Sequence, residues 1–131
     1  MSALLIREAI VTRMKATASL TGLIPAGSMY GERVPVERTY PFTRMGNPIL
    51  TPFKMACHNG EQDEFAVHWF VQGASNDNAV EFGNLLRDEF DEKSLALDGG
   101  GTRDVEWTGG QVFADRDEKD TWHGVATFRV A

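Results

Sequence analysis

The side chains of this chain that are best suited to catalysis or metal binding are three histidines and a single cysteine. His68 lies in "FAVHWFVQ" (residues 65–72) and His123 in "TWHGVATFRV" (residues 121–130), each next to a tryptophan, while Cys57 precedes His58 directly. Imidazole and thiolate groups serve as metal ligands, as general bases or as nucleophiles. If the fold brought His68 and His123 together, they would form a candidate catalytic or metal-binding pair.

The spacing of these residues does not support either chemistry. The chain has no CxxC or HExxH motif and no two histidines one helical turn apart, so we expect no metal site. Nothing adjacent to Cys57 resembles the setting of a catalytic thiol. The acidic runs at 61–64 and 115–120 lack calcium-loop spacing, and the glycines at 99–101 and 109–110 lack phosphate-loop order. We interpret these segments as solvated turns and expect no cofactor.

Alternation of side chains along a strand separates the histidines from their neighbouring tryptophans. Successive residues point to opposite faces of a sheet, so Trp69 and His68 face apart, as do Trp122 and His123. We expect Trp69, Trp122 and also Trp107 to pack in the core. The histidine side is then covered by a second helix layer or by a neighbouring subunit.

The elements that hold these residues follow from periodicity and turn signals. We predict helices from Ser2 to near Ser19 and from Ser75 or Asn76 onward, and strands at 39–45, 65–72, 103–115 and 121–130. Residues 46–64 indicate a long excursion or hairpin arm, and the "TGG" at 108–110 indicates a bulge. The order αββ(β)αββ predicts an α+β fold in one domain, residues 1–131. Both helices pack on one face of a mostly antiparallel sheet of four to five strands.

Composition restricts the class of protein further. The net charge is −6 and the sequence pI is about 5.0, which disfavours broad binding to phosphate backbones. A single cysteine cannot form an intramolecular disulfide, so folding in a reducing cytoplasm is the simpler expectation. We also expect no export signal and no membrane span.

Taken in order, several segments resemble one family. They are "LLIREAIVTRMKATASLTGLI", "MYGERVPVERTYPFTRMG", "EFAVHWFVQ", "AVEFGNLLRDEF" and "GGQVFADRDEKDTWHGVATFRV". This series is similar to the small tail-completion proteins of long-tailed bacteriophages and prophages, also called tail-terminator or tail-to-head joining proteins. The likeness extends over nearly the whole chain and contains no catalytic motif.

The resemblance implies a structural virion protein at the head-proximal end of the tail, made and assembled in the bacterial host cytoplasm. Such a protein forms a homo-oligomeric ring, commonly of six copies, that stops polymerisation of the tail tube protein. The ring also contacts the head-connector or head-closure protein, and phage DNA passes through its channel without specific binding. The resemblance implies no membrane partner and no enzyme activity.

Two other classes of function remain open at this stage. One is a small cytoplasmic enzyme that uses Cys57 with His58 or His123, and the other is a monomeric ligand-binding domain that uses the aromatic strands. For the ring protein, candidate subunit or partner contacts are the basic or apolar residues near predicted loops and on the histidine face. They are Arg33, Arg38, Arg44, Phe53, His123 and Arg129.

Overall fold

The computed structural model describes the backbone of residues 2–55 and 58–131 and the side chains of residues 3–51 and 62–131. The helices are α1 (Ser2–Ala16), α2 (Ala18–Thr21) and α3 (Asp77–Phe90), with a short 3₁₀ turn at Ala26–Ser28. The strands are β1 (Phe42–Met45), β2 (Ile49–Met55), β3 (His58–Gln72), β4 (Lys93–Ala96), β5 (Thr102–Ala114) and β6 (Thr121–Val130). The fold class is α+β, as predicted.

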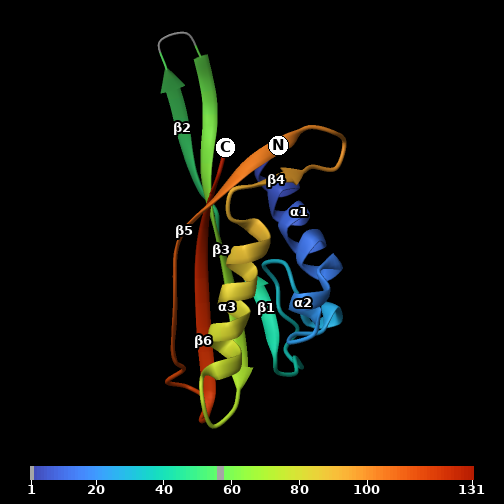
Figure 1. The fold of residues 1–131 in the computed structure, drawn as a ribbon, viewed down its shortest axis with the longest axis vertical. Coiled ribbons are helices and arrows are strands. Elements are labelled where there is room, and N and C mark those ends of the chain that lie inside the picture. The colour runs from blue at the N-terminus through green and yellow to red at the C-terminus, as the bar shows by residue number, and fades with distance from the viewer. Residues whose placement is uncertain (1, 56–57) are drawn as a thin grey trace.

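The six strands form one antiparallel sheet (Figure 1). Five of them follow the order β1, β3, β6, β5, β4, and β2 is the sixth. Strand β2 pairs with the first half of β3, so β1 and β2 share the same side of that long strand. In the centre of the sheet Trp69 lies opposite Gly124, and His68 lies opposite Val125. The predicted bulge is confirmed, because the pairing of β5 with β6 shifts between Trp107 and Gly109.

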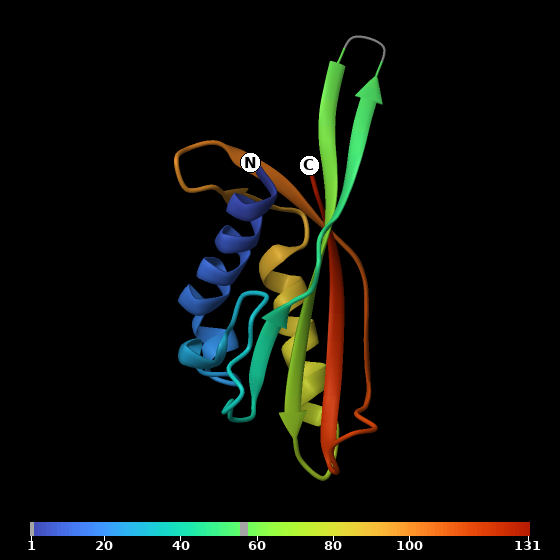
Figure 2. The same ribbon diagram turned by 180° about the vertical axis from the view of Figure 1, so that it is seen from behind.

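Both long helices cover the same face of the sheet. Ile6, Ile10 and Met14 recur every four residues along α1 and are buried, which is the apolar stripe of an amphipathic helix. The corresponding stripe of α3 packs its rings on the sheet, with Phe82 at 5.4 Å from Trp69 and Phe90 at 5.4 Å from Phe128 between ring centroids. Figure 2, seen from behind, shows the sheet in front of α3.

The segment predicted as a hairpin arm is β2 with the first part of β3. Residues 58–62 of β3 pair with β2 but have no partner in β6, whose pairing begins at Asp63 opposite Val130. The hairpin therefore projects beyond the body of the sheet (Figures 1 and 2). In both views the far end of this hairpin lies apart from the helices.

Some details differ from the sequence prediction. The sheet has six strands, because the short β4 pairs with β5 across a turn at 97–101. The glycines at 99–101 predict that turn, but the strand before it was not predicted. The first helix ends at Ala16, and α2 follows after Thr17. The second helix was predicted from Ser75 or Asn76 onward, and it begins at Asp77, with Asn76 as its N-cap residue. Among the described residues, no helix is long and apolar enough to cross a membrane.

Candidate functional site

The face of the sheet opposite α1 and α3 carries a row of aromatic rings. We call it the open face and define it by Phe42, Arg44, His68, Phe70, Phe113 and His123. Neighbouring rings in the row contact each other from β1 to β5. The distance between ring centroids is 4.8 Å for Phe42 and Phe70, 4.2 Å for Phe70 and His123, and 4.7 Å for His123 and Phe113. The row arises because register places one ring from each of four neighbouring strands at the same level.

The two histidines that the sequence placed on separate strands are in direct contact. Nδ1 of His68 lies 2.8 Å from Nε2 of His123, so one ring donates a hydrogen bond to the other. Both imidazoles are half-buried, and the ring of His123 also packs against Phe70 and Phe113. The prediction that they share one face is confirmed. The suggestion of a second helix layer over them is wrong for the described part of the chain, since α1 and α3 lie on the other face.

Both histidines are neutral near pH 7. Burial lowers the pKa of His68 to about 4, and the cation of Arg44 and the second imidazole add to this effect. The pKa of His123 is also lowered, first by burial and then by Arg44, while Asp115 acts in the opposite direction. A neutral pair can share one proton along its hydrogen bond, whereas two imidazolium rings at this distance would repel.

The described residues add no third hydrogen-bonding or metal-ligating side chain to the histidine pair. Within the described residues, the only hydrogen bond of either ring is to the other ring, so no hydroxyl or carboxylate orients them as in a triad. No three metal-ligating side chains of the described part of the chain come together. His58 is ten residues from His68 along β3, about 33 Å in an extended strand. Cys57 lies outside the described residues.

Two arginines lie over this aromatic row without a carboxylate partner. The guanidinium of Arg38 lies 5.5 Å from the centre of the Phe42 ring, and that of Arg44 lies 5.8 Å from the Phe70 ring. Among the described residues, neither has a carboxylate within 4.0 Å. Burial also lowers the pKa of Arg44, which indicates that its charged form is partly desolvated. Among the described residues, Arg44 therefore forms no close ion pair that would offset the cost of its partial desolvation.

Three of the six predicted contact residues therefore converge on one pocket. Arg38, Arg44 and His123 line a hollow of about 460 Å³ with Phe42 and Phe70 on the same wall. Its other wall is acidic and comes from the turn between β5 and β6. The acidic side chains are Asp115, Asp117 and Glu118. Sequence reasoning placed these residues in three separate segments and did not bring them together.

The remaining predicted residues lie elsewhere. Arg129 points to the open face further along β6 and forms an ion pair with Glu106 at 3.4 Å. Arg33 is exposed in the loop before β1 and lines none of the hollows described here. The side chain of Phe53 falls outside the described residues. For these three residues, contact with a partner stays a prediction.

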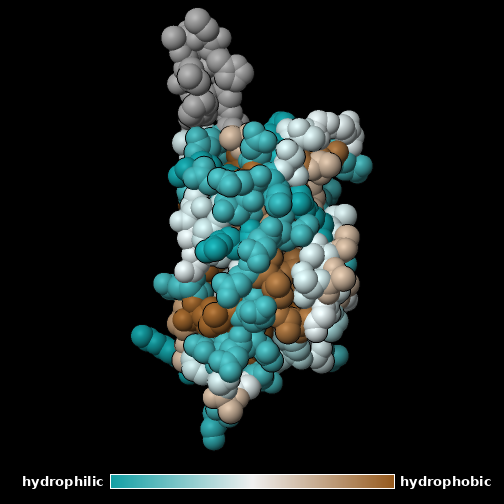
Figure 3. All heavy atoms as spheres, viewed as in Figure 1, coloured by the Kyte–Doolittle hydropathy of each residue, from teal (hydrophilic) through white to brown (hydrophobic). Residues whose placement is uncertain are grey.

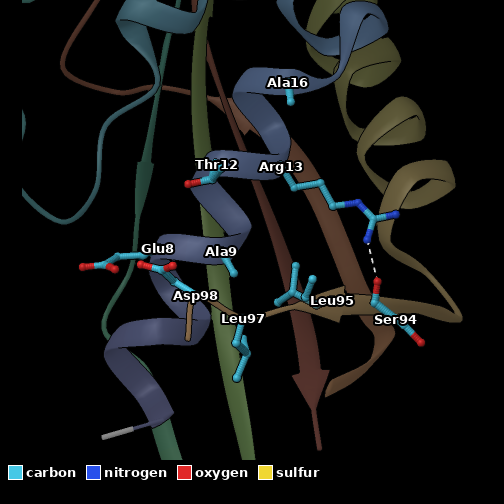
Figure 4. Close-up of a pocket in the computed structure, with 10 residues that line it drawn as sticks. Glu8, Ala9, Thr12, Arg13, Ala16, Ser94, Leu95, Leu97 and Asp98 are labelled. Carbon is cyan, nitrogen blue, oxygen red and sulfur yellow. Dashed lines mark hydrogen bonds between the residues drawn. The ribbon is translucent and has the colours of Figure 1, made fainter. Parts of the chain in front are cut away.

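A larger hollow, of about 600 Å³, lies between α1 and β4 (Figure 4). Its only arginine, Arg13, is already engaged in holding the two elements together. It donates to the Ser94 carbonyl at 2.7 Å and to the Glu89 carboxylate at 3.0 Å. This cation has its partners within the chain, in contrast to Arg38 and Arg44.

The sequence analysis did not name the aromatic members of the open face as candidate contact residues. Phe70 and Phe113 fall on the histidine side by alternation, and Phe113 is among the exposed large apolar residues. Alternation along each strand was the available signal. It could not show that the rings contact each other, because the register between strands is set by tertiary pairing.

The fold and the site define the class: a small α+β domain whose sheet has one helix-covered face and one open face that carries aromatic and basic side chains. The sequence profile of the family described as tail completion protein gp17 matches residues 8–131. The chain belongs to this tail-completion family and is a structural protein of the phage virion tail.

Solved structures agree on the fold. One chain of the virion of a native gene transfer agent particle superimposes with a TM-score of 0.83 at 16% identity, covering 98% of this chain and 94% of that chain. The bacteriophage SPP1 gp17 protein gives a TM-score of 0.63 at 20% identity, covering 99% and 90%. The comparison with curated protein sequences found no match.

Proposed function

We propose that this chain forms a ring of six copies at the head-proximal end of the tail tube. In this role it ends tube polymerisation and joins the tail to the head connector, without enzyme activity. The observation that carries the proposal is membership of the tail-completion family over residues 8–131. The number of copies and the position in the tail come from the resemblance described above.

The open face supports a role in assembly. Arg38 and Arg44 are held over aromatic rings and have no carboxylate partner among the described residues. A guanidinium placed in this way is suited to bidentate pairing with a carboxylate of another protein. We infer that the tail tube protein or the connector supplies that carboxylate.

Passage of DNA is consistent with the charge of the chain. With a net charge of −6 for each copy, a ring repels phosphates on average and favours passage without specific binding. Reversing the charge of the acidic residues found to line the channel should slow DNA ejection. Unchanged ejection would count against this part of the proposal.

An enzyme is the alternative class, and the histidine pair gives a direct comparison. Alanine at Cys57, His68 and His123 should leave a ring protein able to assemble if it folds. An enzyme would lose turnover with the same changes.

The proposal is tested in particles that lack the protein. We expect tails of uncontrolled length or tails unattached to heads, and imaging of complete particles should show a ring of this protein at the head–tail junction. Normal virions without the protein would refute the proposed function.

A further inference from the structure

Two edges of the sheet are covered within the chain. At β1, the Tyr30 N–H donates to the Thr43 carbonyl at 3.0 Å, and the Met45 N–H donates to the Gly31 carbonyl at 2.9 Å. At β4, Arg13 of α1 reaches the Ser94 carbonyl (Figure 4). These contacts block the pairing of another strand at either place.

The second half of β5 has an uncovered edge. The Asp115 N–H donates to the Thr121 carbonyl of β6 at 2.9 Å, so odd-numbered residues after the bulge face β6. The backbone groups of Gly110, Val112 and Ala114 therefore point away from the sheet. In the described part of the chain they have no hydrogen-bond partner, whereas Asp91 accepts from the outward Trp107 N–H at 2.8 Å.

The outer edge of β2, at the opposite side of the sheet, makes no backbone hydrogen bond among the described residues. The Ala66 carbonyl of β3 accepts from the Gly46 N–H at 2.8 Å, so even-numbered residues of β3 face β1 and β2. Ile49, which lies opposite Glu64, therefore points its backbone groups inward, and Leu50 points its own outward. Pro52 also points outward and has no N–H, which limits further pairing to the base of the arm.

Exposed apolar side chains gather at these two edges. Ile49 and Leu50 are 59% and 55% exposed and point to opposite faces of β2. Beside β5, Val80 and Phe113 are 42% and 38% exposed, one on each face of the sheet. A groove of about 260 Å³ lies between α3 and β5, lined by Val80 and Val112 (Figure 3 shows apolar surface along this side of α3).

The register of β2 with β3 shows to which face of the sheet Ile49 and Leu50 point. Leu50 lies opposite Asp63, on the helix-covered face, and Ile49 lies opposite Glu64, on the open face. If β2 of one copy lay beside β5 of another, Leu50 would face the groove at Val80 and Ile49 would face Phe113. Residues 47–53 and 107–114 contain no charged side chain, so this contact avoids the repulsion expected between copies of net charge −6.

We propose that residues 49–51 of β2 in one copy add to residues 110–114 of β5 in the next copy as an antiparallel strand. This inference rests on the proposed ring and names the surfaces that would build it. The chain direction agrees if the ring axis runs along the strands, because β2 and β5 already run antiparallel within one sheet and rotation about such an axis keeps that relation. The contact is head-to-tail, which generates rings when the rotation closes.

One variant at each edge tests the proposal. Val112→Pro removes the outward N–H of β5 without removing a bond to β6, and Val112→Ala is its matched control because it keeps the N–H. Leu50→Asp places a charge on the β2 edge, and Val36→Asp, at a position 92% exposed in a loop, is the matched control. Circular dichroism and thermal unfolding verify the fold, and Ala114→Pro at an exposed position replaces Val112→Pro if that variant does not fold.

Native mass spectrometry then measures the association of purified chains. We expect the wild type and both controls to associate, and Val112→Pro and Leu50→Asp each to weaken association at least tenfold. Because the contact is head-to-tail, an equimolar mixture of these two variants retains one intact pair of edges. It should form a 1:1 dimer and nothing larger.

Three results would overturn the inference. They are a mixture that stays monomeric, a Val112→Pro variant that associates like Val112→Ala, or a wild type that stays monomeric up to about 1 mM. The proposed function fails separately. Normal virions without the protein would refute the tail role but leave the edge contact intact, whereas a junction ring unaffected by Val112→Pro would refute only the edge contact.

Discussion

The packing of Trp69 on Gly124 gives a quantitative test of the fold. The indole is buried, its Nε1–H donates to the Ala79 carbonyl at 2.9 Å, and its ring covers Gly124 on the neighbouring strand. A Cβ atom at residue 124 would lie 2.0 Å from Cε2 of Trp69 and 2.3 Å from Cζ2. Gly124→Ala is therefore impossible without moving the indole.

The cost of that movement has two parts. Overpacking of a core position typically costs about 1–3 kcal/mol, and a shift that breaks the bond to Ala79 adds about 1 kcal/mol. We expect Gly124→Ala to lower the free energy of unfolding by about 2–4 kcal/mol. For a chain of this length, that corresponds to a fall in Tm of about 6–15 °C.

Urea unfolding followed by tryptophan fluorescence measures this loss. The matched control is Gly109→Ala, because a Cβ there meets nothing nearer than Oγ1 of Thr127 at 4.0 Å and should change stability by less than about 0.5 kcal/mol. In the double variant, Trp69→Phe removes most of the overlap caused by Gly124→Ala. The double variant should therefore lose less unfolding free energy than the sum of the losses in the two single variants, by more than about 1 kcal/mol. Wild-type stability of Gly124→Ala, or strictly additive costs, would refute the reasoning.

Three further predictions concern the open face and the β5 edge. Because the folded-state pKa of His68 is lowered from 6.5 to about 4, the unfolded chain binds more protons between these values. The free energy of unfolding should therefore fall as pH drops from 6.5 to 4, by about 1–2 kcal/mol after allowance for solvent screening. Urea titrations at each pH measure this loss, and His68→Asn should remove most of the pH dependence. Arg44→Met keeps the contact with Phe70 but removes a half-buried cation that forms no ion pair among the described residues. The free chain should therefore be as stable as the wild type or up to about 1 kcal/mol more stable. Incorporation of this variant into particles should fall. Asp91→Ala leaves the Trp107 N–H without its acceptor and should cost about 1–2 kcal/mol in thermal unfolding, whereas Asp91→Asn keeps an acceptor oxygen and should cost less than half of that.

Each of these predictions has an opposing outcome. An unchanged pH dependence in His68→Asn would assign the effect to other groups. A large loss of stability in Arg44→Met would show that the guanidinium has a stabilising role within the chain, and normal incorporation would separate it from assembly. Equal costs for Asp91→Ala and Asp91→Asn would mean that the hydrogen bond to Trp107 contributes little.

The class of fold and the strands at 65–72, 103–115 and 121–130 could be predicted from local patterns, whereas the short strand β4 could not. Alternation in residues 65–72 predicts that Trp69 and His68 point to opposite faces. A period of four residues in the first helix predicts its apolar stripe. Both signals depend only on the geometry of one element. The bulge at 108–110 was equally local, since glycine acts on its own backbone. The start of α3 near Asn76 was also predicted from local sequence, but the Asn76 side chain forms no capping hydrogen bond.

Tertiary structure alone decided what those elements bring together. The 2.8 Å contact between His68 and His123 depends on the register of β3 with β6. The pocket with Arg38 and Arg44 requires three strands, the loop before β1 and the turn between β5 and β6 to converge. The uncovered edges of β2 and β5 become visible only once the sheet order is known. A strand specifies which side chains share its face, but its neighbour, its register and its free edge result from the competition of all strands for pairing.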